Sequence, residues 1–214
     1  NVSFTGTVTA VSFTQAAGSG TTRFDGAEDY SGAFSFTGTN LEQNGTCTVG
    51  TNYSFTGVAL TINDALTVDG TTTVTNSGLF TKNSTGVITA SGGFTQNGTG
   101  LNSIGANIST TNTNLSFGTG ITLTTSVQLS TGAGGGDITV SSTVDPTTDS
   151  VEGLTLLAGS GNISVTGPVG SSKRLGALTV SSGNNVSFTG AVTAVSFTQT
   201  VGSGRRGLMV QRTT

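Results

Sequence analysis

Residues 1–20 read NVSFTGTVTAVSFTQAAGSG, and residues 185–204 read NVSFTGAVTAVSFTQTVGSG. Seventeen of these twenty positions are identical at an offset of 184 residues. The match predicts a tandem repeat, with one full β-solenoid unit over residues 1–184 and the start of the next unit over residues 185–204. A long tandem repeat is typical of a linear stack of similar structural elements.

The last ten residues depart from this repeat. Residues 205–214 read RRGLMVQRTT where the first unit has TTRFDGAEDY at residues 21–30. The codons ACG ACG CGG TTT GAT GGT GCA GAG GAC TAC encode the second string, and they encode the first when one base is skipped. We therefore interpret residues 205–214 as a frameshifted tail rather than a genuine capping segment. Residues 1–204 hold four basic and ten acidic residues, and hence a net charge of −6.

A shorter motif recurs inside the unit, with the order Asn, apolar, Ser, apolar, Thr, Gly. It occurs at residues 1–6, 52–57 and 162–167, and in looser form at 33–38 and 114–118. Apolar residues that alternate with Ser or Thr predict a half-buried strand, and the closing glycine suits a tight corner. Further strands are expected at residues 8–14, 58–62, 66–68, 72–75, 87–89, 121–124, 138–140, 154–157 and 178–180.

The composition favours an all-β chain with almost no helix. Thr, Gly, Ser and Asn, which are poor helix formers, make up 119 of the 214 residues. Corners rich in Gly, Asn and Ser, with few two-residue hairpin turns, favour a parallel β-helix (solenoid) over a β-sandwich, which is the alternative. Coils of about 20–25 residues would give eight or nine coils in each unit, or roughly 40 Å of fibre.

The strings NVSFTG, AVTAVSFTQ, GSGTTRFDG and NISVTGPVG resemble the repeats of filamentous-haemagglutinin-like and autotransporter-type giant surface proteins of bacteria, which are adhesins. The resemblance covers essentially the whole chain up to residue 204. It implies a right-handed parallel β-helix that is exported and serves adhesion or surface-matrix formation. It also implies that the repeats carry no catalytic residue.

Charge and reactive side chains argue against several functions. Charged residues are 8% of the chain, and there is no histidine, so histidine-dependent catalysis is absent. A formal charge of −3 without a basic patch argues against a nucleic-acid partner. No stretch approaches the ~20 apolar residues of a membrane-spanning helix. The lone Cys47 is expected to be a small core residue.

Candidate binding sites are few. Asp25, Glu28 and Asp29 form the densest acidic cluster, which would suit calcium or a carbohydrate-active groove, but a solvated loop is the preferred reading. Residues 134–140, GGGDITV, resemble one copy of a calcium-binding nonapeptide, although such sites need consecutive copies. We therefore expect no catalytic, cofactor or metal residues.

Pairs with the pattern Thr-x-Thr raise the possibility of an ice-binding face, but their spacing does not keep one coil length. They occur at Thr5/Thr7/Thr9, Thr37/Thr39, Thr46/Thr48, Thr71/Thr73/Thr75, Thr111/Thr113 and Thr122/Thr124. The eleven Phe and two Tyr mostly occupy strand positions, so core packing is expected for them and sugar binding is the minor alternative.

The sequence thus predicts a non-enzymatic stalk or fibre segment of a very large secreted or cell-surface bacterial protein. The alternatives are a carbohydrate-binding or carbohydrate-active β-helix and an ice-binding β-helix. Because the chain begins within a strand motif, we interpret it as an internal fragment. Expected partners are neighbouring repeats of the same chain, a host or matrix surface or polysaccharide, and other copies through uncapped solenoid ends.

Overall fold

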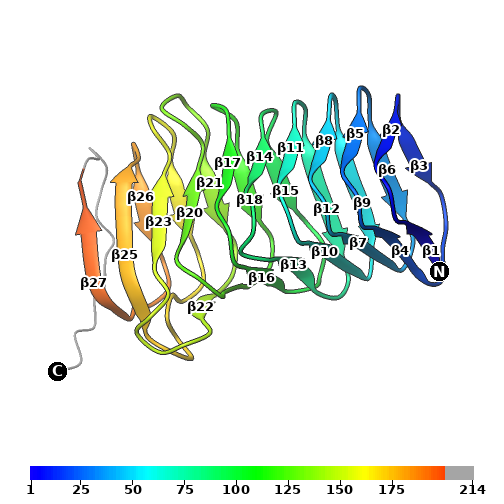
Figure 1. Ribbon diagram of the computed structural model, residues 1–214. Helices are drawn as coiled ribbons and strands as arrows, with labels where there is room; N and C mark the ends of the chain where they lie inside the picture. Colours follow the sequence, from blue (N-terminus) through cyan, green and yellow to red (C-terminus); the bar gives the residue numbers. More distant parts are fainter. Residues whose placement is uncertain (201–214) are drawn as a thin grey trace.

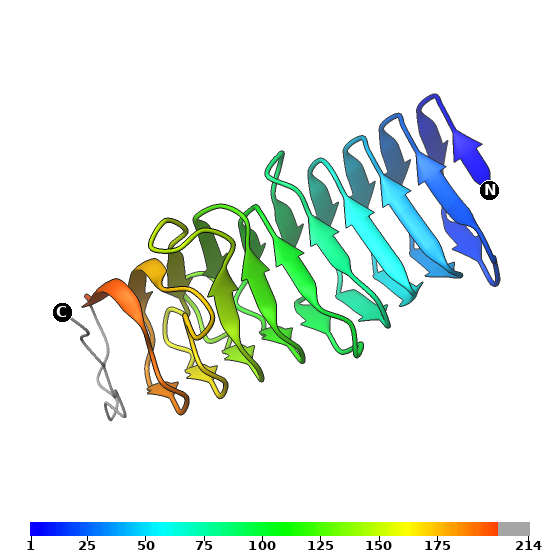
Figure 2. The same ribbon diagram turned by 90° about the horizontal axis from the view of Figure 1, so that it is seen from below.

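In the computed structural model, residues 1–200 are described and form a ladder of short β-strands (Figures 1 and 2). The chain advances through three strands per coil, one on each side of the stack, and each coil pairs with the next in parallel. No helix occurs between residues 1 and 200. The parallel β-helix expected from the sequence is therefore confirmed. The expected frameshifted tail at 205–214 lies outside the described residues.

The strands assemble into three sheets, which we name A, B and C. Sheet A contains β1 (Val2–Phe4), β4 (Thr21–Phe24), β7 (Asn40–Gln43), β10 (Ala59–Ile62), β13 (Phe80–Lys82), β16 (Asn102–Ile104), β19 (Ile121–Leu123) and β22 (Val144–Pro146). Sheet B contains β2 (Val8–Ala10), β5 (Glu28–Tyr30), β8 (Cys47–Val49), β11 (Leu66–Val68), β14 (Ile88–Ala90), β17 (Ile108–Thr110), β20 (Val127–Ser130), β23 (Leu154–Leu157), β25 (Leu175–Ser182) and β27 (Ala194–Gln199). Sheet C contains β3 (Phe13–Gln15), β6 (Phe34–Thr37), β9 (Tyr53–Gly57), β12 (Thr72–Asn76), β15 (Phe94–Gln96), β18 (Leu115–Phe117), β21 (Ile138–Val140), β24 (Ile163–Val165) and β26 (Val186–Phe188).

Coil length follows from the register of sheet A. Isolated bridges extend this sheet from Val144 to Val169 and from Val169 to Val192. Successive equivalent residues are 19 to 25 positions apart, and the longer coils are the later ones. The expected range of about 20–25 residues is thus nearly right. The ten strands of sheet B mark ten turns within residues 1–200.

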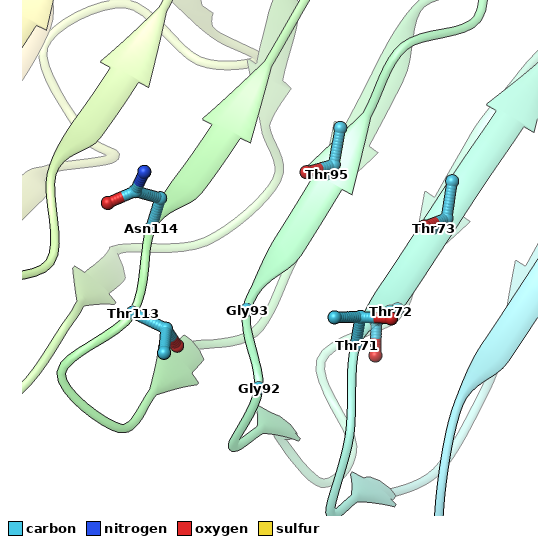
Figure 3. A pocket seen from close by; sticks show the side chains of 8 residues that line it. All are labelled: Thr71, Thr72, Thr73, Gly92, Gly93, Thr95, Thr113 and Asn114. Atoms are coloured by element: carbon cyan, nitrogen blue, oxygen red, sulfur yellow. The ribbon is translucent and has the colours of Figure 1, made fainter.

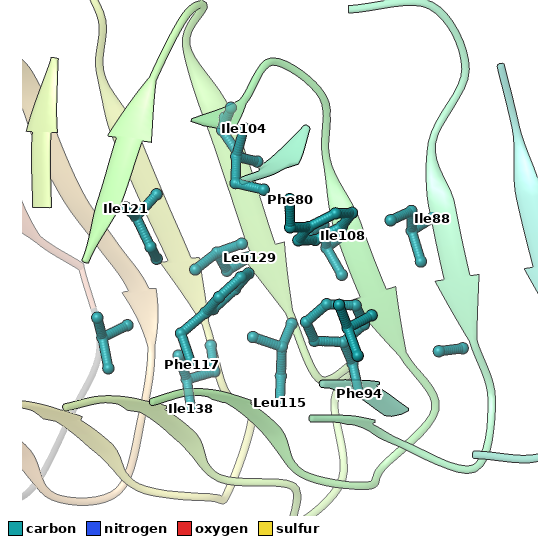
Figure 4. Packing of buried hydrophobic residues seen from close by; sticks show 14 of the residues in the cluster. Phe80, Ile88, Phe94, Ile104, Ile108, Leu115, Phe117, Ile121, Leu129 and Ile138 are labelled. Atoms are coloured by element: carbon teal, nitrogen blue, oxygen red, sulfur yellow. The ribbon is translucent and has the colours of Figure 1, made fainter. Parts of the chain in front are cut away.

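Alternate side chains point into the stack and form a continuous core (Figure 4). Parts of the interior columns place like residues above one another. The rings of Phe13, Phe34 and Tyr53 stack with centroid separations of 4.9 and 4.8 Å. Burial of such a side chain contributes about 1.5–3 kcal/mol, so the interior columns stabilise the stack. Cys47 is buried among them, as expected.

Glycine is required where coils approach closely at the corner between sheets A and B. A Cβ atom on Gly45 would lie 2.3 Å from the carbonyl oxygen of Gly26, and one on Gly26 would lie 2.4 Å from that of Gly6. Real Cβ atoms do not approach backbone this closely, so a larger residue would push the coils apart. The corner glycines Gly26 and Gly45 therefore set the spacing between backbones.

Two local predictions are wrong. Residues 8–14 form two strands, β2 and β3, because the chain bends at Val11, whose side chain is 74% exposed. No glycine or proline marks this corner. Glu28 and Asp29 were expected in a solvated loop, yet they form β5 together with Tyr30, with Glu28 and Tyr30 buried and Asp29 exposed. Pairing with β2 and β8 outweighs the low strand propensity of the acidic residues.

Candidate functional site

The outer surface of sheet C carries a continuous row of hydroxyl side chains. In each of its nine strands the outward residue that pairs with the next strand is Ser or Thr. The row, which we call the hydroxyl ladder, consists of Thr14, Ser35, Ser54, Thr73, Thr95, Ser116, Thr139, Ser164 and Ser187. Neighbouring members are in register, so their spacing along the stack is about 4.8 Å.

Strand alternation produces this row. The residues on either side of each ladder position point inward, as Phe34 and Phe36 do on either side of Ser35. The nine strands of sheet C contain no charged residue, whereas the equivalent outward positions of sheet A include Arg23, Glu42 and Asp145. The ladder is thus an uncharged face that both donates and accepts hydrogen bonds.

A second hydroxyl column accompanies the ladder over three coils. Thr37, Thr56 and Thr75 pair in register two residues beyond the ladder positions of β6, β9 and β12. The Oγ1 of Thr75 donates to Oδ1 of Asn97 in the following coil at 2.6 Å. Paired columns therefore extend over only part of the face.

A shallow depression of about 450 Å³ lies at the start of the strands in the middle of this face. Figure 3 shows Thr73 and Thr95 on adjacent strands, with Thr113 and Asn114 on the next coil. Gly92 and Gly93 contribute only backbone to the lining. The depression offers hydroxyl, amide and backbone groups, which suits a neutral, hydrogen-bonding ligand.

A buried polar network lies inside the first coils. The Glu28 carboxylate accepts a hydrogen bond from Gln43 Nε2 at 2.9 Å and one from Tyr30 Oη at 3.1 Å. The hydroxyl of Tyr53 donates to Gln43 Oε1 at 2.6 Å. Burial raises the pKa of Glu28 to about 7, although both hydrogen bonds to the carboxylate oppose the shift. Burial likewise raises the pKa values of Tyr30, Tyr53 and the Cys47 thiol.

Further buried polar side chains interrupt the core. Lys82 is fully buried, and its Nζ donates to the carbonyl oxygens of Asn83 and Thr85 at 3.1 and 2.5 Å. Burial lowers the pKa of Lys82 to about 8. In neighbouring coils, Gln96 Nε2 donates to Asn76 Oδ1 at 2.7 Å, and Asn102 Nδ2 donates to Thr119 Oγ1 at 3.0 Å. These groups are enclosed by the coils, so they act on stability.

The acidic residues singled out in the sequence do not converge. Glu28 points into the core, Asp29 points out from sheet B, and Asp25 lies at a corner. Asp25 forms an ion pair with Arg23 and accepts a hydrogen bond from Asn44 Nδ2 at 2.7 Å, which together lower its pKa. Strand alternation turns the carboxylates of Glu28 and Asp29 to opposite faces of sheet B, and Asp25 lies outside the strand, so the three carboxylates do not meet.

Asp137, from the GGGDITV stretch, is a corner residue. Its Oδ1 accepts hydrogen bonds from the backbone N and the Nδ2 of Asn162, at 2.7 and 3.1 Å. Asn162 in turn accepts from Asn185 Nδ2 at 2.9 Å. Within residues 1–200 no group of three or more His, Cys, Asp or Glu side chains is placed to hold a metal ion.

The regularity of the hydroxyl ladder was missed in the sequence. The Thr-x-Thr pairs are scattered over the sheets and corners: Thr48 lies in sheet B, Thr73 in sheet C and Thr122 in sheet A. The serine of the recurrent motif was the signal, because the motif copies at 33–38, 52–57, 114–118 and 162–167 supply Ser35, Ser54, Ser116 and Ser164. These copies mark four of the nine ladder positions, and the register of the coils supplies the other five.

No family model, curated protein or solved structure matches this chain. Among the described residues, no helix has the length and apolar character needed to span a membrane. The candidate site therefore rests on the geometry of the chain itself.

Proposed function

We propose that the chain is a repeat segment of a long secreted or cell-surface bacterial fibre, with a mechanical role in adhesion or matrix formation. One observation carries this proposal: β26, in the second copy of the repeat, pairs directly with β24 of the first copy. The Asn185 side chain also continues the corner hydrogen bonds of Asn162. A second unit thus extends the stack without a linker.

The packing of the interior supports a mechanical role. Stacked rings such as Phe36 and Phe55, with centroids 5.4 Å apart, join consecutive coils, and backbone hydrogen bonds join them on all three sides. A force along the stack is therefore shared among many parallel interactions.

Chains with one, two and three copies of residues 1–184 test the proposal. Small-angle X-ray scattering should show a constant cross-section and a length that grows by roughly 40 Å per copy. Independent globular beads joined at variable angles would contradict it.

The hydroxyl ladder favours ice binding as a second candidate function, because nine uncharged hydroxyl positions repeat in register on one face. Thermal hysteresis of the purified chain tests this directly. Activity lost in Thr73→Lys/Thr95→Lys but kept in Thr67→Lys/Thr89→Lys, a matched pair on adjacent strands of sheet B, would support the sheet C face. A chain without hysteresis would remove the candidate.

A further inference from the structure

The two copies of the repeat occupy different sheets. Val2 and Phe4 pair with Thr22 and Phe24 in sheet A, whereas their equivalents Val186 and Phe188 pair in sheet C. Val8 lies in sheet B, but Val192 bridges to Val169 in line with sheet A. Phe13 pairs with Phe34 in sheet C, but Phe197 pairs with Leu178 in sheet B. The second copy is therefore displaced by one sheet.

Counting the sides of the solenoid gives the same result. Each coil has three sides, and the segment at Val169 forms one side although it is not a named strand. The chain therefore advances by 26 sides from β1 to β26, of which eight full coils account for 24 and two remain. The 184-residue unit thus spans eight and two-thirds coils. Its length in coils is not a whole number, so a residue and its equivalent one unit later face different directions.

The motif keeps its internal chemistry in either sheet. Val2 and Phe4 pair with the buried Thr22 and Phe24 in sheet A, although Val2 itself is 51% exposed at the open end of the stack, and Val186 and Phe188 are buried in sheet C. Asn1 Oδ1 accepts from the backbone N of Thr21 at 2.9 Å, much as Asn162 Oδ1 accepts from that of Asn185 at 3.3 Å.

The motif glycines behave in the same way. Gly6 stacks against Gly26 at the corner after sheet A, and Gly190 stacks against Gly167 at the corner after sheet C. Because inward and outward positions and corner contacts are all preserved, a unit fits the stack equally well after a shift by one sheet.

We infer that successive units of the fibre are rotated by one sheet about the solenoid axis, so that the hydroxyl ladder lies on a different side in each unit and returns to the same side after three. This inference rests on the proposed fibre. Three units, or 26 coils, would occupy about 125 Å. The fibre would then present its uncharged hydroxyl face to all three sides rather than along one edge.

Spin labels on the full 214-residue chain test the rotation at the junction that it already contains. In a Cys47→Ala background, labels at Ser164→Cys and Ser187→Cys would lie on paired residues of sheet C, about 4.8 Å apart along the stack. Labels at Thr179→Cys and Thr198→Cys would be paired in sheet B, although Thr14, the equivalent of Thr198, lies in sheet C. Both double variants should show strong dipolar broadening that is absent from the single variants.

The pair Ser116→Cys/Thr139→Cys, in the middle of sheet C, is the matched control. Broadening in this control without broadening at 164/187 and 179/198 would overturn the rotation and the pairing of β24 with β26. Growth in length by roughly 40 Å per added copy, measured by scattering, would then decide separately whether units still stack into a fibre. Loss of broadening in the control as well would overturn both, because the coils would not be stacked.

Discussion

Gln43 donates a hydrogen bond of 2.9 Å from Nε2 to Oε1 of Glu28, which lies in the preceding coil and is only 2% exposed. Glu28 is thus an ionisable side chain inside a narrow core that is otherwise largely apolar. It makes the stability of the first coils depend on pH, although the residues involved take no part in the outer face.

Replacing Glu28 by Gln should remove that dependence. The pKa of Glu28 is raised from 4.5 to about 7, so the folded chain binds the proton more tightly than the unfolded chain. The contribution of Glu28 to stability is therefore highest below pH 4.5 and falls, by about 3 kcal/mol, as the pH rises to 7. Urea unfolding should show the stability of Glu28→Gln relative to wild type increasing over this range. Glu42→Gln, on the outside of sheet A, is the control.

Replacing Lys82 by Met should stabilise the chain at neutral pH. Lys82 lies between Ile62 and Ile104 in an interior column, and its pKa is lowered to about 8. The charged form is disfavoured in the folded state, so the cost is present below pH 8 and fades as the pH approaches 10.5. After the loss of two hydrogen bonds to carbonyl groups, we expect a net gain of about 1–2 kcal/mol at pH 7. A destabilised Lys82→Met at pH 7 would contradict this account.

Gly45→Ala and Gly6→Ala should differ sharply, although both residues occupy the same corner. A Cβ atom on Gly45 would lie 2.3 Å from the Gly26 carbonyl oxygen, whereas one on Gly6 would meet nothing within 4 Å. We expect Gly45→Ala to lose about 1–3 kcal/mol, and Gly6→Ala to be neutral or slightly stabilising. Thermal unfolding of the two variants measures the difference, and equal effects would argue against close packing at the corner.

Much of the architecture could be predicted because it depends on short-range patterns. Alternation of apolar and hydroxyl residues located strands such as β9 and β24, and the 184-residue repeat favoured a stack. The corner at Val11 could not be found, because no glycine or proline marks it. The strand β5 was missed for a related reason: its acidic residues are held by neighbours 19 or 20 positions away.

The outer face was harder to predict than the core. Because coil length varies from 19 to 25 residues, equivalent positions do not recur at one fixed spacing in the sequence. The hydroxyl ladder can therefore be recognised only once the register of each coil is known. The expected absence of catalytic and metal residues, the bacterial origin and the cell-surface location stay predictions.

Replacing Asn63 by Ala should weaken the corner between sheets A and B. The side chains of Asn44, Asn63 and Asn83 form a row of hydrogen bonds along this corner. Asn44 Nδ2 donates to Oδ1 of Asp25, and each following Nδ2 donates to Oδ1 of the asparagine in the preceding coil. Asn63→Ala removes both bonds of the central member, with an expected loss of about 1–2 kcal/mol. Thr61→Ala, on the outside of sheet A in the same coil, should stay within about 0.5 kcal/mol. Equal losses of stability in the two variants would contradict a structural role for this row of asparagine side chains.

Distances along the hydroxyl ladder test the stacked-coil account most directly. With one spin label at Ser187 and the second moved from Thr95 to Thr73, Ser54, Ser35 and Thr14, each step crosses one coil of sheet C. Pulsed electron–electron double resonance should give distances between the two labels that rise linearly, from roughly 19 Å to roughly 38 Å, in steps of about 4.8 Å. Distances that level off or reverse as the second label moves toward the N-terminus would show a chain folded back on itself, and would contradict the solenoid and the fibre together.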